Sequence, residues 1–126
     1  MYDAVVAGGS ISGLLAAREI AKGGYSVLVL EEGFEVGSPE HCGGLVSKNA
    51  LKELEIEPSN KTFDSEIECA KIFSPEGKEI TINSKRQQII VINRRELDKQ
   101  AARQARDHGA EISVKTSFQE KIKEGV

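Results

Sequence analysis

The chain has 126 residues and a formal net charge of −3 at pH 7. This length allows one modest domain with a hydrophobic core, but not a dinucleotide-binding domain together with a substrate domain. The net negative charge argues against a nucleic-acid partner, and the interspersed acidic and basic residues argue against a polybasic membrane patch. Glycines interrupt the apolar N-terminal segment, so neither a signal peptide nor a transmembrane segment is expected.

The first 31 residues contain the strongest functional signal. An apolar strand is predicted at residues 2–7, and it leads into the turn Gly8-Gly9-Ser10-Ile11-Ser12-Gly13. A helix at about 12–22 ends at a glycine pair, and a second strand at 26–30 ends at Glu31. Strand, glycine turn, helix, strand and terminal acid form the arrangement that binds the ADP half of a dinucleotide, with the pyrophosphate at the helix N-terminus.

Two residues of this segment define the expected ligand. Glu31 follows the turn at the spacing where an acid accepts the ribose hydroxyls and repels a 2′-phosphate, so FAD or NAD fits better than NADP. Ser10 stands where the G-x-G-x-x-G pattern has its middle glycine; its side chain takes space from the phosphates, although its hydroxyl can donate to them. The alternative is an ordinary βαβ unit whose glycines serve only packing.

The remaining elements follow in chain order. A glycine-rich loop at 32–39 leads into residues 41–46, and a short helix follows Ser47. Strands at 67–73 and 79–82 flank a Ser-Pro-Glu-Gly-Lys turn, which predicts a β-hairpin.

An apolar run at 89–92 precedes a helix at about 95–108 and a last strand at 111–116. The strands at 2–7, 26–30 and 111–116 are expected to pair in the 3-2-1 order of a dinucleotide-binding half-sheet. The predicted class is α/β, a Rossmann-like FAD/NAD(P)-binding parallel sheet with a β-hairpin insertion. Residues 1–126 are assigned to one partial FAD-binding domain with an inserted β segment at about 66–92, truncated because no segment remains for the flavin half.

The two cysteines, Cys42 and Cys69, have no metal-type spacing, so no metal site is expected. Free thiols in a reducing cytoplasm are the default for such a chain, and peripheral contact with a membrane is left open. Cys69 alternates within a strand pattern and is expected in the core.

Four stretches give the chain a family resemblance: the first strand with its GGSISG turn and Glu31, the loop VGSPEHCGGLVSKNALKELEI, the hairpin IFSPEGKEI, and the run INRRELD at 92–98. On these stretches the chain resembles the N-terminal portion of the geranylgeranyl reductase family, FAD flavoproteins related to the p-hydroxybenzoate hydroxylase group. The loop, hairpin and last run are similar to the family's VSK-x-AL-x-EL run, SP-x-GK turn and Arg-x-x-Phe/Leu-Asp motif. Within the family, the likeness is to the digeranylgeranylglycerophospholipid reductases.

The resemblance implies cofactor-binding roles for residues in both halves of the chain. Those expected at FAD are Gly8, Gly9, Ser10, Ser12 and Gly13 at the pyrophosphate, Glu31 at the adenosine ribose, Arg94, the main chain at Phe118 near the adenine, and Cys42, Gly43 and Gly44 near the flavin ring. The Cys42 loop is one residue shorter here than the common family form. Arg94 is alternatively a solvated charge at a helix start.

Cys42 is the single candidate for a catalytic role. A thiol in a glycine loop is accessible, and the adjacent His41 can lower its pKa. The alternative is a small apolar residue that closes a pocket floor.

The family implied by the resemblance uses FAD to reduce double bonds of geranylgeranyl chains in isoprenoid lipid biosynthesis. Implied partners are a prenyl lipid substrate, an electron donor that is a nicotinamide or an iron–sulfur carrier, and a missing C-terminal half. We expect a chain that is incomplete for catalysis and binds flavin or ADP-like ligands weakly by itself. Two alternatives stay open: an FAD-dependent monooxygenase-type flavoprotein, which should lack the cysteine-glycine loop, and a non-catalytic nucleotide-binding remnant.

Overall fold

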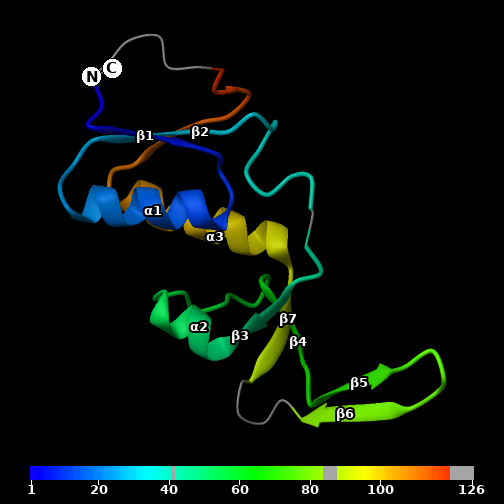
Figure 1. The fold of residues 1–126 in the computed structure, drawn as a ribbon. Coiled ribbons are helices and arrows are strands. Elements are labelled where there is room, and N and C mark those ends of the chain that lie inside the picture. Colours follow the sequence, from blue (N-terminus) through cyan, green and yellow to red (C-terminus); the bar gives the residue numbers. More distant parts are fainter. Residues whose placement is uncertain (41, 84–87, 120–126) are drawn as a thin grey trace. The chain divides into compact units, whose positions relative to one another are not determined.

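The structure is a computed structural model that describes residues 1–40, 42–83 and 88–119. Its helices and strands are numbered in chain order in Figure 1. It divides into two compact units: the first is Met1–Glu40 with Arg95–Val126, and the second is His41–Arg94. The assignment of the whole chain to one FAD-binding domain stays a prediction.

A parallel three-stranded sheet in the order β1-β2-β8 forms the centre of the first unit. Its strands are β1 (Ala4–Ala7), β2 (Val27–Leu30) and β8 (Glu111–Ser113). The order and direction are those of the predicted half-sheet, so the Rossmann-like α/β class is confirmed. β8 is shorter than the predicted strand at 111–116, because the chain bends after Ser113 and Lys115 adopts a φ of 55°.

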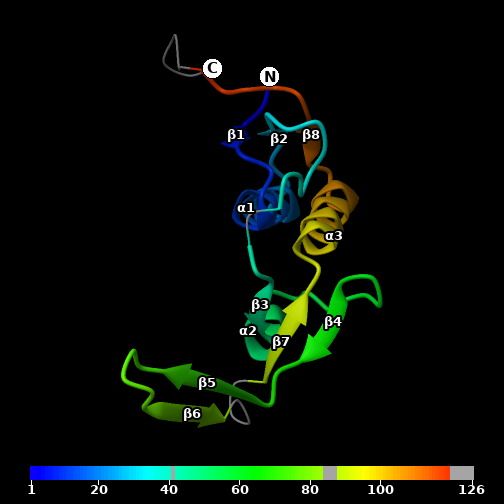
Figure 2. The ribbon, with the colours of Figure 1, turned by 90° about the vertical axis from the view of Figure 1, so that its right-hand side faces the viewer.

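Two helices, α1 (Ile11–Lys22) and α3 (Arg94–Asp107), lie on one face of this sheet (Figure 2). Their buried side chains recur at helical spacing, as the sequence predicts, and most are small, which lets both helices approach the strands. The core of the unit contains Leu14, Ala17, Ala21, Val27, Val29, Val36, Ala101, Ala102, Ala105 and Ala110.

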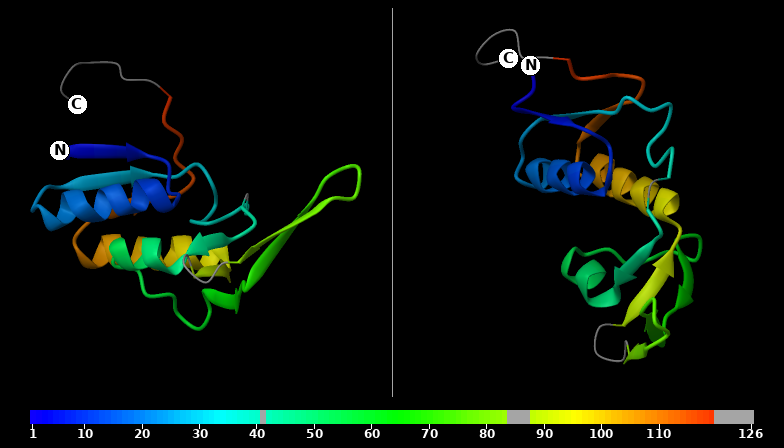
Figure 3. Two further views of the ribbon diagram at one scale, coloured as in Figure 1. Left: turned by 60° about the horizontal axis from the view of Figure 1, so that its bottom comes forward. Right: turned by 45° about the vertical axis from the view of Figure 1, so that its right-hand side comes forward.

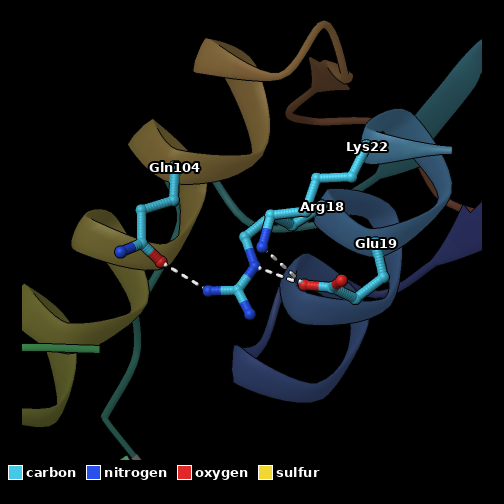
Figure 4. A network of polar contacts seen from close by, with 4 residues as sticks. All are labelled: Arg18, Glu19, Lys22 and Gln104. Atoms are coloured by element: carbon cyan, nitrogen blue, oxygen red, sulfur yellow. Dashed lines mark hydrogen bonds and ion pairs between the residues drawn. The ribbon is translucent and has the colours of Figure 1, made fainter. Parts of the chain in front are cut away.

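A buried arginine links the two helices (Figure 4). Arg18 is 5% exposed; its Nε donates to Glu19 Oε1 at 2.8 Å, and its Nη1 donates to Gln104 Oε1 of α3 at 2.9 Å. The hydrogen bond from Arg18 is the largest cause that lowers the pKa of Glu19. The guanidinium is therefore paired where burial of an unpaired charge would be costly.

The second unit contains an antiparallel sheet in the order β3-β7-β4 and a separate hairpin, β5-β6. Its elements are β3 (Leu45–Ser47), α2 (Lys48–Glu53), β4 (Phe63–Glu66), β5 (Cys69–Phe73), β6 (Glu79–Asn83) and β7 (Ile89–Ile92). Buried Leu51, Ile56, Thr62 and Ile90 lie within this unit. No helix in the described part of the chain is long and apolar enough to cross a membrane.

The hairpin is confirmed, but the predicted burial of Cys69 is wrong. Every residue of β5 and β6 is exposed, Cys69 included, because the hairpin is a two-stranded ribbon (Figure 3). The alternation of apolar and polar residues therefore predicts the strand, but it does not predict whether another part of the chain covers the apolar face of that strand. The sequence analysis missed β3 and β4: β3 has only three residues, and the Phe-Asp-Ser-Glu of β4 has no apolar alternation and is exposed throughout.

Candidate nucleotide-binding site

The glycine turn joins β1 to α1 by a close contact between backbone groups. Gly8 has a φ of +105°, and its N–H donates to the Leu30 carbonyl at 2.8 Å. A Cβ added at Gly13 would lie 2.1 Å from the Gly8 carbonyl oxygen and 3.2 Å from Val6 Cγ1. Only glycine at residue 13 lets the first turn of α1 lie this close to the end of β1, which is the role of the third glycine in the dinucleotide motif.

Glu31 lies at the mouth of this turn. One carboxylate oxygen, Oε2, accepts the Gly9 N–H at 2.7 Å, and the other, Oε1, accepts the Gly33 N–H at 2.7 Å. A Cβ at Gly9 would come within 2.9 Å of Oε2, so a larger residue would displace the carboxylate. Because the carboxyl ends of parallel strands meet at one edge of a sheet, β1 and β2 bring the glycine turn and the acid together.

The N-terminus of α1 is suited to an anion. The first turn of the helix contains no acidic residue, and the N-cap Ser10 makes no side-chain capping hydrogen bond. Ser10 and Ser12 are both exposed. The backbone N–H groups of a first helical turn have no partner within the helix, and the helix dipole favours negative charge there. The glycine turn, the N-terminus of α1 and the carboxylate of Glu31 have the arrangement expected for a site that binds the ADP half of a dinucleotide.

A turn after β8 holds the backbone around Glu31. The Glu31 N–H donates to the Ser113 carbonyl at 2.9 Å, and the Thr116 N–H donates to the Glu31 carbonyl at 2.9 Å. The Lys115 N–H donates to the Gly33 carbonyl at 2.8 Å. Phe118, two residues after Thr116, is 53% exposed. Sequence reasoning missed Gly33 and this turn, which it assigned to a strand.

The basic residues at the start of α3 differ in their surroundings. Arg94, the predicted FAD contact, is the first residue of α3 and is half-buried. Arg95, which the sequence analysis did not select, pairs with Glu35, and Lys99 Nζ lies 3.0 Å from the same carboxylate. The hydrogen bond from Lys99 lowers the pKa of Glu35 most; burial opposes this, and the charge of Arg95 adds to the lowering. Arg95 Nε is buried without an acceptor in the described part of the chain.

The predicted Cys42 loop belongs to the second unit. Cys42 and Gly43 are exposed, and His41 lies outside the described residues. Gly44 is buried with a φ of +73°, and a Cβ there would lie 2.2 Å from the Ile92 carbonyl oxygen. The Ile92 N–H also donates to the Gly44 carbonyl at 2.9 Å. Packing against β7 therefore explains Gly44, whereas nothing in the described packing requires glycine at residue 43.

Almost the whole chain can be aligned with proteins of known name, in sequence and in structure. A digeranylgeranylglycerophospholipid reductase of Methanocella arvoryzae is 37% identical over 118 residues, which cover 91% of this chain and 30% of that protein. The protein of that name from Picrophilus torridus is 33% identical over 128 residues, which cover 98% of this chain and 32% of that protein. A geranylgeranyl bacteriochlorophyll reductase-like structure from Thermoplasma acidophilum has a TM-score of 0.90 and 35% identity, and the match covers 98% of this chain and 32% of that one.

The resemblance to the geranylgeranyl reductase family is confirmed. The chain spans about a third of the length of these relatives. No family model matches it. The structure of a myxobacterial FAD-dependent chondrochloren halogenase is 19% identical, with a TM-score of 0.71, and the match covers 98% of this chain and 31% of that one. It is more distant than these reductases and shows only that the fold is shared.

Proposed function

We propose that the chain binds the ADP half of FAD at the glycine turn, as part of a flavoprotein that reduces prenyl chains. The observation that carries the proposal is the position of Glu31, whose carboxylate accepts the Gly9 N–H at 2.7 Å. An acid fixed at the mouth of a strand–turn–helix is placed to accept ribose hydroxyls while the pyrophosphate lies at the helix end.

The residues expected at FAD then each have a definite task. The N–H groups of the turn and the hydroxyls of Ser10 and Ser12 donate to the pyrophosphate, and Gly13 keeps α1 close to β1. Glu31 accepts from the ribose, and the backbone near Phe118 borders the adenine. Arg94 supplies a fixed cation to FAD, as its family counterpart is expected to do. These assignments rest on the family resemblance together with the exposure of Ser10, Ser12 and Phe118.

The proposed activity of the whole protein is reduction of isolated carbon–carbon double bonds in geranylgeranyl chains of lipids. The relatives bear the names of such reductases, and the halogenase is more distant. When bound, reduced FAD supplies the hydride. The chain's own contribution is to bind and orient the ADP half, and the Cys42 loop is proposed to border the flavin ring. A nicotinamide or an iron–sulfur carrier is the proposed electron source.

A titration with FAD tests the proposal for this chain. Binding is followed by the visible absorption and fluorescence of the flavin, with ADP as competitor. Glu31→Gln keeps the size of the side chain but removes its charge and turns an NH2 group toward one of the two backbone N–H donors. We therefore expect FAD to bind about tenfold more weakly, the loss of roughly one charge-assisted hydrogen bond. Glu32→Gln, an exposed neighbour with the same charge change, is the control.

Three outcomes separate the candidates. Flavin binding that ADP displaces and that Glu31→Gln weakens supports the proposal. Binding of ADP or NAD without any preference for FAD favours the non-catalytic nucleotide-binding alternative. No spectral change with FAD and no binding of ADP at high micromolar concentration would show that the turn is a packing device.

A further inference from the structure

The Glu31 carboxylate is anchored at both of its oxygens before any ligand arrives. Gly9 holds Oε2 and Gly33 holds Oε1, each through a backbone N–H at 2.7 Å. A carboxylate has about four lone-pair positions, so these two hydrogen bonds leave about two for the hydroxyls of a ribose. Hydrogen bonds to an ionised group are short and strong, and donors on the backbone cannot rotate away as side chains do.

The second anchor is itself held in place. The Gly33 carbonyl accepts the Lys115 N–H at 2.8 Å, and the Glu31 carbonyl accepts the Thr116 N–H at 2.9 Å. Within the turn at 113–116, the hydroxyls of Ser113 and Thr116 lie 2.8 Å apart. Lys115 adopts a φ of 55°, in the left-handed region that a residue with a side chain adopts only when its surroundings fix it. The turn therefore holds the two peptides on either side of the one that carries the Gly33 N–H, and so limits the directions in which this N–H can point.

We propose that Gly33, held by the 113–116 turn, is a positioning residue that fixes the Glu31 carboxylate and so sets the selectivity for a free ribose over a 2′-phosphorylated one. This inference rests on the proposed function. A glutamate free to change rotamer would swing away from a 2′-phosphate and relieve the repulsion. The doubly anchored carboxylate has to break a charge-assisted hydrogen bond before it moves, so the repulsion persists. Because the two hydrogen bonds already hold the Glu31 side chain, the binding of a ribose does not carry the entropy cost of fixing it.

The affinity test compares ADP with its 2′-phosphorylated counterpart by isothermal titration calorimetry. In Gly33→Ala, the new methyl group would lie 2.9 Å from Glu31 Oε1 and 2.9 Å from the Ser38 carbonyl oxygen, so the carboxylate must move. We expect the preference for ADP to fall by about tenfold, as expected for loss of one hydrogen bond to a charged group. Gly23→Ala, at the end of α1 and away from the turn, is the glycine control and should leave the preference unchanged.

A second measurement needs no ligand. Amide protons that donate to a carboxylate have characteristic low-field NMR positions, so Glu31→Gln should shift the Gly9 and Gly33 amide protons together. Glu32→Gln should leave the Gly9 proton in place and move the proton of its sequence neighbour Gly33 only slightly. If Gly33→Ala does not fold, Glu31→Asp replaces it in the affinity test, because a side chain one methylene shorter cannot reach both N–H groups.

The two tests separate the inference from the proposed function. If ADP does not bind the native chain, the proposed function fails while the amide protons still report on the double anchor. If ADP binds but the Gly33 amide proton ignores Glu31→Gln, Gly33 is not an anchor. If a folded Gly33→Ala keeps the native preference for ADP, the selectivity role is wrong.

Discussion

Replacement of Gly13 by alanine tests whether the glycine turn is built by close backbone packing. Two effects oppose each other. Alanine in a helix is favoured over glycine by about 1 kcal/mol, which would stabilise α1. The added Cβ, however, would lie 2.1 Å from the Gly8 carbonyl oxygen, a backbone atom that cannot rotate aside. Overpacking at a tight site costs about 1–3 kcal/mol or more, and the contact with backbone places this change at the upper end.

The packing cost therefore outweighs the helix propensity, and Gly13→Ala should lower the free energy of unfolding by about 2 kcal/mol. Urea denaturation followed by circular dichroism measures this. Ala16→Gly, at an exposed position of the same helix, is the control; it has no such contact and should cost only the propensity difference of about 1 kcal/mol. If Gly13→Ala is as stable as the native chain or more stable, the close approach of α1 to the Gly8 carbonyl is wrong.

Three further predictions concern packing and charge. Glu19, the ion-pair partner of Arg18, is 56% exposed, so the pair contributes little to stability, whereas the side chain of Arg18 is buried. Arg18→Met keeps most of the buried stem and should change the free energy of unfolding by less than about 1 kcal/mol. Arg18→Ala removes the stem and should lower it by about 2 kcal/mol; urea denaturation measures both changes. The pKa of Glu35 lies below its ordinary value of 4.5, so its ion pairs contribute to stability above pH 4.5, and this contribution is lost as the pH falls through the lowered pKa. In Glu35→Gln, the part of the fall in stability at low pH that comes from Glu35 should disappear from a plot of the free energy of unfolding against pH. An unchanged plot would contradict the pairing. Gly44→Ala places a Cβ 2.2 Å from the Ile92 carbonyl oxygen at a residue with a positive φ, and should lower the free energy of unfolding by about 3 kcal/mol. Hydrogen exchange should then show that the amides of β7 lose protection. Protection equal to that of the native chain would refute this prediction.

Much of the first unit could be predicted because its patterns are local and strong. The spacing of Leu14, Ala17 and Ala21 indicates a helix with one buried face, and a strand before the glycines predicts where that helix begins. The meeting of Glu31 with the turn follows from topology, since the first two strands are parallel and share an edge.

The anchor at Gly33 could not be predicted from the sequence. A glycine in a loop has no periodic neighbours, and the peptides on either side of its N–H are held by a turn distant in sequence, at 113–116. The exposed Cys69 shows the opposite limit. Its alternating pattern predicts a strand correctly, but whether a second layer covers that strand depends on contacts between segments that no local pattern reports.

The most direct test of the central claim is a crystal structure of the chain with ADP bound. The account predicts the diphosphate at the N-terminus of α1, within hydrogen-bond distance of the Ser12 and Gly13 N–H groups, and the ribose hydroxyls on the Glu31 carboxylate. A nucleotide bound elsewhere, or a ribose that Glu31 does not contact, would contradict it.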